Sequence, residues 1–167
     1  FFGYHDLCPW RPDDGMMALL RVPEPPDGLP PPDSLAEVCL WTPGDDALAP
    51  VGTTTTWNWQ IGARAQWLPG AKATLLWNDR DHDNQPITRL RDVRNGASRV
   101  VSGNVFAVSR DGTCGLAPHF GRLARHWPAY GHAGLAAPGQ CSTSTCARTT
   151  PTTPARTRRR RWRCWRH

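Results

Sequence analysis

The sequence predicts an all-β fold of short antiparallel strands joined by turns. Seventeen prolines and fifteen glycines among 167 residues leave little room for long helices. The apolar runs are short and end at turn residues, which favours strands over helices. The clearest unit is residues 65–79, where an aromatic segment, the turn Pro69-Gly70 and a short apolar run follow one another. The length allows one ordinary domain.

The first 46 residues predict two strand-forming segments separated by an insertion. Pro12-Asp13-Asp14-Gly15 is a turn sequence, because Pro presets φ and Gly accepts a positive φ, so the apolar segments beside it would be adjacent antiparallel strands. The insertion 23–34 contains six prolines, which predicts an extended surface segment. Residues 36–41 resume a strand, and residues 42–46 form its turn.

Two further units follow the central one. In residues 87–93 apolar and polar side chains alternate, as in a half-buried strand. Asn95-Gly96 is a strong hairpin signal, and residues 98–101 would be the return strand. The third unit has strands in residues 104–109 and 113–117, with Arg110-Asp111-Gly112 as its turn.

The turns of these units align as a repeat. Pro12, Pro69 and Arg110 occupy equivalent turn positions, with spacings of 57 and 41 residues, and the insertion accounts for the longer interval. Periods of about 40–50 residues with several strands each indicate propeller blades. Residues 1–135 therefore predict an incomplete β-propeller of about two to three blades. The alternative is an all-β sandwich whose turns merely look alike.

The order of short motifs in residues 1–135 resembles a group of bacterial proteins predicted to be β-propellers of the TolB-like and oligogalacturonate-lyase-like types. The motifs are Phe1-Phe2-Gly3-Tyr4, Cys8-Pro9-Trp10, Trp57-Asn58-Trp59-Gln60, Gln66-Trp67-Leu68-Pro69, Trp77-Asn78-Asp79-Arg80, Ser109-Arg110-Asp111-Gly112 and His119-Phe120-Gly121-Arg122-Leu123. Two features depart from the family: His5 stands where a second Tyr is expected, and residues 125–132 match their motif loosely.

The resemblance implies a fold more firmly than an activity. Family members continue beyond this length with further blades. The lyase type would imply metal-assisted removal of a proton beside a uronate carboxylate, at a His-rich site that later blades contribute. His119 and His126 do not supply that site, so whether the chain is an enzyme stays open.

Charge separates the chain into a domain and a tail. Residues 1–135 hold 12 basic and 14 acidic side chains, whereas residues 136–167 hold eight arginines and no acid. Residues 136–167 also contain no Leu, Ile, Val, Met or Phe, so they cannot form an apolar core. We therefore expect the tail to be a disordered, basic, Arg/Thr/Pro-rich segment.

Two interpretations of the tail are open. Residues 158–161 with Trp162 and Trp165 would contact phosphates and stack on bases, so nucleic acid is a partner only if the tail is genuine. The favoured interpretation is a GC-rich reading frame translated out of register, because Arg, Thr, Pro, Ala, Cys and Trp are the residues that such frames yield. Sequencing the gene through codons 130–167 distinguishes the two.

The six cysteines contain no CxxC pair. Cys8, Cys39 and Cys114 each lie in or beside an apolar segment, which predicts small buried side chains with reduced thiols. The three cysteines of the tail, with His167, do not have the spacing of a common structural zinc site. We therefore expect no metal site and no cofactor.

Neither a membrane span nor a signal peptide is visible. No apolar run approaches the roughly 18 residues that a transmembrane helix requires, so we expect no membrane partner. The sequence begins Phe1-Phe2 without a basic-then-apolar leader, and the absence of Met indicates a fragment. The N-terminus therefore predicts no compartment.

Polar and aromatic side chains gather at two places in the central unit, and they are the candidate ligand-binding residues. Aromatic rings bind the C–H faces of sugars, while amides, carboxylates and Arg bind the hydroxyls, within a pocket of few polar groups. The alternative is that the tryptophans pack between blades and the Asn and Asp residues cap turns. The candidates are Trp57, Asn58, Trp59, Gln60, Gln66, Trp67, Asn78, Asp79 and Arg80.

Asp79, Asp81, His82 and Asp83 form an acidic segment after the predicted strand. Hard oxygen ligands suit calcium or manganese, but a solvated acidic turn explains the same residues.

Three functions are compatible with these residues. The first is a ligand-binding or scaffold propeller module with an oligosaccharide-like ligand, which needs no catalytic constellation. The second is a truncated polysaccharide-processing enzyme of the lyase or hydrolase type. The third is nucleic-acid binding through the tail. We favour the first.

Overall fold

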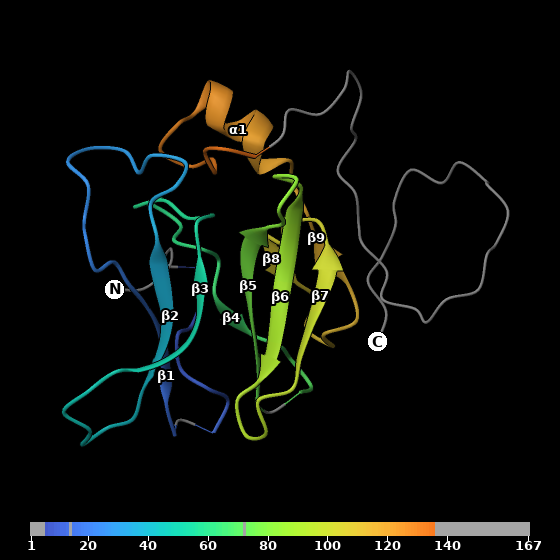
Figure 1. Ribbon diagram of the computed structural model, residues 1–167. Helices are drawn as coiled ribbons and strands as arrows, with labels where there is room; N and C mark the ends of the chain where they lie inside the picture. Colours follow the sequence, from blue (N-terminus) through green and yellow to red (C-terminus); the bar gives the residue numbers. More distant parts are fainter. Residues whose placement is uncertain (1–5, 14, 72, 136–167) are drawn as a thin grey trace, which may run out of the picture.

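The computed structural model describes residues 6–13, 15–71 and 73–135 (Figure 1). These residues contain nine strands and one helix, and every strand pair is antiparallel. The prediction of a mostly β fold made of antiparallel strands is confirmed for the described residues. The motif at residues 1–4, His5 and the whole tail with its cysteines lie outside the described residues.

The first sheet has the order β1-β2-β3, with strands Met17–Arg21, Ala36–Trp41 and Ala49–Thr54. The first two strands lie where the sequence predicts them, and the turn after β2 has Gly44 at φ +97°. The third strand was not predicted. It contains Pro50 and Gly52, and Pro and Gly are uncommon in strands. The segment therefore lacks the composition of a strand, although it pairs along its length with β2.

The middle sheet has the order β4-β5-β6-β7, with strands Gln66–Trp67, Thr74–Arg80, Pro86–Asp92 and Ser98–Ser102. All four lie in segments that the sequence predicts to be extended. Gly70 and Gly96 both have positive φ, +78° and +76°, as their turns require. The hairpin at Asn95-Gly96 is confirmed with a four-residue loop, because Asp92 and Ala97 form the last backbone hydrogen bond, at 2.9 Å.

The third sheet is a short hairpin of β8 (Ala107–Val108) and β9 (Gly115–Leu116), followed by the helix α1 (Phe120–His126). The strands are shorter than the sequence suggests. The helix was not predicted, since seven residues give no clear period. His119 caps it: the ring Nδ1 accepts a hydrogen bond from the backbone N–H of Arg122 at 3.0 Å. Within the described ranges no helix is long and apolar enough to cross a membrane.

The three turns that align in the sequence occupy equivalent places in the fold. Each joins the first strand or bridge of a sheet to its second strand. The pairs that they connect are Trp10 with Met17, Gln66 with Leu76, and Ala107 with Leu116. The repeat read from the sequence therefore corresponds to a repeat in the order of strands.

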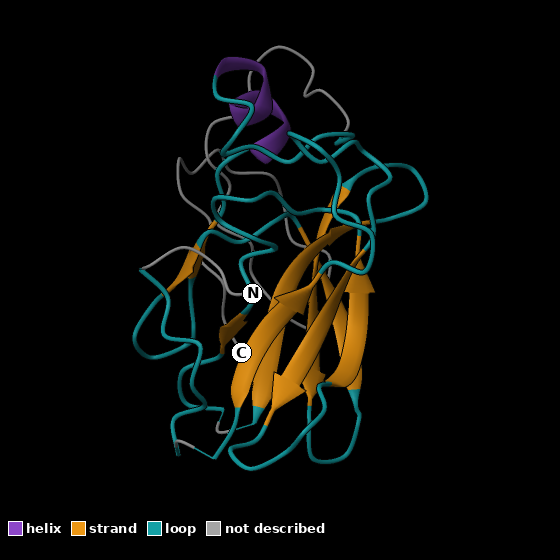
Figure 2. Cartoon of the chain, turned by 90° about the vertical axis from the view of Figure 1, so that its left-hand side faces the viewer, coloured by secondary structure: helices purple, strands orange, loops and turns teal. Residues whose placement is uncertain are grey.

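Within the middle sheet, β5 is buried on both faces. Side chains alternate along β5, so Leu75 and Trp77 pack into a cluster with the first sheet, while Leu76 packs with Leu90 and Val105 on the opposite side. Figures 1 and 2 show the larger strands arranged side by side with α1 at one end. Burial on both faces explains why residues 75–77 form a continuous apolar run.

The first and middle sheets approach closely at Gly52. A Cβ at this position would lie 2.4 Å from Cζ2 of Trp77. The Trp77 indole N–H also donates to the carbonyl of Thr53 at 3.3 Å. The absent side chain at residue 52 therefore lets the Trp77 ring lie directly against β3.

The described cysteines are free thiols, but their burial differs from the prediction. Cys39 is buried and Cys114 half-buried, whereas Cys8 is exposed. The prediction of a buried Cys8 is wrong, because β1 forms only a single bridge with the segment that contains this residue, so no sheet covers it. The insertion 23–34, which the sequence predicts to be extended, contains bends and a turn at residues 32–33, with Gly28 at φ +92°, and its Leu29 is 52% exposed.

Candidate functional site

Some of the residues predicted to form a site lie at the end of the sheets that carries α1, namely the segment 57–60 and Arg80. The insertion 23–34, the segment 55–64, the β5–β6 turn and residues 119–135 meet there, and we call this region the loop end (Figure 1). Side chains hold these segments together over long sequence distances. Loops fixed on a sheet scaffold are the usual place for binding residues.

Trp57 and Trp59 fasten the insertion to the loop end. The Trp57 indole N–H donates to the carbonyl of Ser34 at 2.7 Å, and that of Trp59 donates to the carbonyl of Gly28 at 2.6 Å. The two rings meet edge to face, with centroids 4.8 Å apart and an interplanar angle of 88°. Trp57 is 3% exposed, whereas Trp59 is 40% exposed. Trp59 is therefore a fixed aromatic ring that still faces solvent.

Asn58 and Asn78 are buried and hydrogen-bond to segments that are distant in the sequence. The Asn58 amide donates to the carbonyl of Gly131 at 2.8 Å, and its oxygen accepts from the backbone N–H of Ile61 at 2.8 Å. The Asn78 amide donates to the carbonyl of Val105 at 3.0 Å, and its oxygen accepts the N–H of the same residue at 2.8 Å. Both side chains are therefore occupied by backbone groups.

Gln66 and Trp67 are also buried, each 7% exposed. The Gln66 amide donates to the carbonyl of Arg64 at 3.3 Å, and the Trp67 indole N–H donates to the carbonyl of Pro9 at 2.9 Å. Trp67 belongs to the apolar cluster between the first and middle sheets. These two side chains hold β4 against neighbouring backbone.

Asp79 and Arg80 form ion pairs that point in opposite directions. The Asp79 carboxylate is 2.5 Å from the Arg89 guanidinium and also accepts a hydrogen bond from Thr54. Arg80 lies at the loop end, 2.7 Å from the Asp33 carboxylate. Its guanidinium also donates to two backbone carbonyls, those of Pro32 and Gly134. Arg80 therefore joins the insertion to the segment after α1.

Of the nine candidate residues, Trp59 and Gln60 are exposed and Arg80 is partly so. The others are buried and bonded to the protein's own groups. The segment 57–60 lies at the loop end, whereas Trp67 and Asn78 bond to Pro9 and Val105 in other parts of the fold. The structure leaves Trp59 and its neighbour Gln60 as the surface available to a ligand at the loop end.

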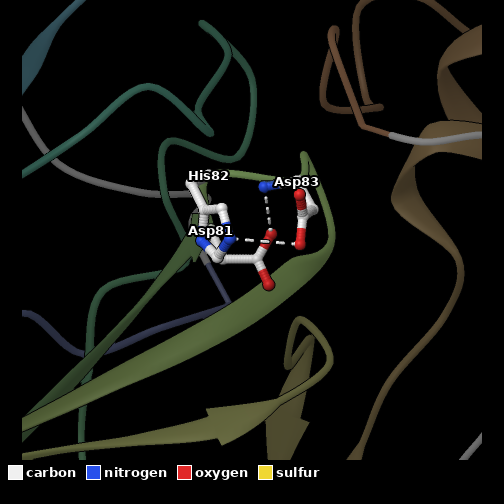
Figure 3. A group of neighbouring side chains, drawn as sticks. All are labelled: Asp81, His82 and Asp83. Carbon is white, nitrogen blue, oxygen red and sulfur yellow. Dashed lines mark hydrogen bonds and ion pairs between the residues drawn. The ribbon is translucent and has the colours of Figure 1, made fainter.

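The acidic segment after β5 forms an exposed turn (Figure 3). Ligand atoms of Asp81, His82 and Asp83 lie within 4.8 Å of one another. The Asp81 carboxylate already accepts the backbone N–H groups of Asp83 and Gln85, at 3.0 and 2.8 Å. Asp79 does not join them, because it is buried against Arg89. Hydrogen bonds within the turn account for this cluster, and nothing else at the turn indicates an ion.

Arg64 is the strongest polar anchor that sequence reasoning missed. Its side chain is fully buried and forms a bidentate ion pair with Asp6, at 2.9 and 3.0 Å. Its guanidinium carbon lies 4.0 Å from the centroid of the Phe106 ring, and its Nε donates to the carbonyl of the same residue. An isolated Arg within the apolar stretch 61–65 is the one signal that could have identified it.

His132 is a second buried group that the sequence did not indicate. Its ring stacks on Phe120, with centroids 4.3 Å apart, and within the described residues neither ring nitrogen has a hydrogen-bond partner. Burial, reinforced by the nearby positive charge of Arg64, lowers the pKa of His132 to about 3, and the weaker effect of the Gly62 backbone opposes this. The ring is therefore neutral in the folded protein at ordinary pH.

The free energy of unfolding should decrease as the pH falls below about 6.5, the ordinary pKa of His. The unfolded chain then binds a proton that the folded protein rejects until about pH 3, so stability is lost at up to about 1.4 kcal/mol per pH unit. Burial lowers the pKa of His119 as well, which adds to the loss in the same direction. Urea unfolding at a series of pH values between 7 and 4 measures the effect.

The variant His132→Phe provides the control for this prediction. It keeps the stacked ring and removes the two buried nitrogens, so the slope between pH 6.5 and 4 should decrease markedly. Hydrogen bonds from Arg94 and Ser109 lower the pKa values of Asp92 and Asp111, respectively, to about 2, so these carboxylates add to the loss of stability only as the pH approaches their ordinary value of 3.8, and they do so equally in the native protein and the variant. An unchanged slope in the variant would show that His132 is not the titrating group.

Comparison with protein-family models gave no match, and searches of the curated proteins and of the solved structures also gave none. Function is therefore argued from the geometry of the loop end and of the sheets.

Proposed function

We propose that the chain is a ligand-binding or scaffold module of the β-propeller type, with an oligosaccharide-like ligand held at the loop end. Two consecutive antiparallel meanders and a hairpin support the propeller interpretation, because they follow one another along the chain without a crossover. The burial of both faces of β5, each against a different neighbour, supports it further. Stacked meanders of this kind are what the blades of a propeller are.

Trp59 is the observation that carries the proposed ligand. Its ring is held by the hydrogen bond to Gly28 and by the contact with Trp57, yet the residue is 40% exposed. Fixing an aromatic ring in advance lowers the entropy lost on binding. Gln60, which is exposed beside it, supplies an amide for hydroxyl groups. An aromatic face with an adjacent amide suits a sugar ring.

A glycan array tests this proposal, with Trp59→Ala as the test variant and Trp41→Ala as the matched control. Trp41 is partly exposed and is the last residue of β2, at the end of that strand opposite to the insertion. We expect the native protein and Trp41→Ala to bind the same glycans. Trp59→Ala should bind them about tenfold more weakly, since stacking on an aromatic ring is worth about 1–2 kcal/mol.

Two results would count against the proposal. One is the absence of binding to any glycan, and the other is equal binding by the native protein and Trp59→Ala. The midpoint of thermal unfolding of Trp59→Ala should be recorded alongside, because the same substitution removes the hydrogen bond to Gly28. A loss of binding counts as support when the variant stays folded at the temperature of the array.

A further inference from the structure

A second surface lies away from the loop end, in a groove between the first and middle sheets. The groove has a volume of about 400 Å³ and is lined by parts of β3, β5, β6 and β7. Its principal side chains are those of Val51, Thr53, Trp77, Arg89, Arg91 and Val100. None of the described residues that line it is acidic. The groove is therefore positively charged and partly apolar.

Arg89 and Arg91 lie on the same face of β6. In the pairing of β5 with β6, Arg89 is opposite Trp77 and Arg91 is opposite Leu75. Trp77 and Leu75 pack against the first sheet, so the two arginines project toward the same side, one strand further out. Residues two apart on a strand are separated by roughly 6.8 Å. The Arg89 side chain pairs with Asp79, whereas the side chain of Arg91 forms no hydrogen bond or ion pair with another described residue.

The strand β3 borders this groove with an open edge. It is the last strand of its sheet and pairs with β2 on one side only. At Gly52 it lies against Trp77 of β5. Neighbouring strands are about 4.8 Å apart, so a strand added beside β3 would lie one position further out, above β6. Pro50 has no N–H group, which restricts the added pairing to the other residues of β3.

We propose that this groove binds an acidic, extended polypeptide segment of a partner protein, which pairs with β3 as an additional strand. Every second side chain of such a segment points toward the middle sheet, so acidic residues at alternate positions would meet Arg89 and Arg91. Backbone pairing supplies affinity in this mode of recognition, and the side-chain contacts supply specificity. The chain's own tail does not have this chemistry, because it carries eight arginines and no acid. The site is independent of the proposed glycan surface.

Fluorescence anisotropy with a labelled peptide of about ten residues, in which Asp alternates with Val, tests the proposal. We expect saturable binding that weakens as salt is raised, since the contact involves partly exposed charges. Arg91→Glu should weaken binding about tenfold or more. Arg110→Glu is the matched control: it makes the same change of charge at an exposed turn of the third sheet, and should leave binding unchanged.

A second pair of peptides tests the backbone pairing. Amide N–H groups along a strand point alternately to its two edges, so N-methylation of one alternate set should abolish binding and N-methylation of the other should not. Trp59→Ala should bind the unmethylated peptide with the same affinity as the native protein. This result would show that the groove acts independently of the glycan surface, so the two proposals can fail separately. Arg91→Glu and Arg110→Glu can be checked for native folding by near-UV circular dichroism.

Three results would overturn the inference. Equal binding by Arg91→Glu and the native protein would exclude the groove. Retention of binding by both N-methylated peptides, or equal affinity for a flexible polyanion such as polyphosphate, would mean that the surface attracts negative charge without pairing a strand. A dimer in light scattering that dissociates in Arg91→Glu would assign the groove to a second copy of the chain instead.

Discussion

Replacing Arg64 by Ala is expected to lower the free energy of unfolding by about 3 kcal/mol or more. The substitution removes a fully buried guanidinium that binds Asp6 at two atoms and the carbonyl of Phe106. It also leaves a void beneath the Phe106 ring, over which the guanidinium lies. Residue 64 has a φ of +53°, which is about as unfavourable for Ala as for Arg. Relief of backbone strain therefore does not compensate for the lost stability. Urea unfolding followed by circular dichroism measures the change.

Two further variants separate the causes. Arg64→Lys keeps the charge and loses the bidentate geometry, so its stability should lie between those of the native protein and Arg64→Ala. Arg110→Ala removes an exposed arginine and should change stability by less than about 0.5 kcal/mol. If Arg64→Ala were as stable as Arg110→Ala, the pair with Asp6 would not hold the N-terminal segment to the fold.

The second large effect is expected for Asn78→Ala, with a loss of about 2–4 kcal/mol. Asn78 is fully buried and satisfies both the N–H and the carbonyl of Val105. Leaving a buried polar group without a partner costs about 1–3 kcal/mol for each group. Because Val105 precedes the third sheet, hydrogen exchange should also increase in β8 and β9 relative to the middle sheet.

Asn95→Ala is the matched control for this prediction. Asn95 makes a local hydrogen bond to the backbone N–H of Ala97 in an exposed turn, so its removal should cost less than about 1 kcal/mol. Asn78→Asp keeps an acceptor for the N–H of Val105 but places an oxygen against its carbonyl, and should also be strongly destabilised near neutral pH. If Asn78→Ala had native stability and native hydrogen exchange in β8, the hydrogen bonds of Asn78 to Val105 would not hold the third sheet to the fold.

The strands that the sequence predicts are those with local signals. Gly70, Gly96 and Gly112 have positive φ at the predicted turns, and the alternation or length of the apolar runs locates the strands around them. The strand β3 is specified instead by its partner β2 and by the contact of Gly52 with Trp77. The contact forms only when β3 pairs with β2, and the local sequence of β3 does not indicate that pairing. The short helix α1 is fixed by its cap and its surroundings.

Residue type indicated the candidate residues, but neither their place in the fold nor the role of each one. Trp57 and Trp59 lie at the loop end, whereas Trp67 packs between the first and middle sheets. Asn58 and Asn78 bind the backbone of Gly131 and Val105, which are 73 and 27 residues away in sequence. Arg64 bonds with Asp6, 58 residues distant. Roles that depend on such distant partners follow from tertiary packing, and residue type alone does not indicate them.

The most direct test of the proposed binding module is a titration with a glycan selected on the array, followed by the indole N–H resonances in ¹⁵N–¹H spectra. We expect a shift of the Trp59 resonance, which is identified by its absence in Trp59→Phe. The resonances of Trp57 and Trp67, whose N–H groups donate to backbone carbonyls in buried positions, should stay unchanged. Shifts confined to other indoles, with Trp59 unaffected, would contradict the assignment of the ligand to this surface.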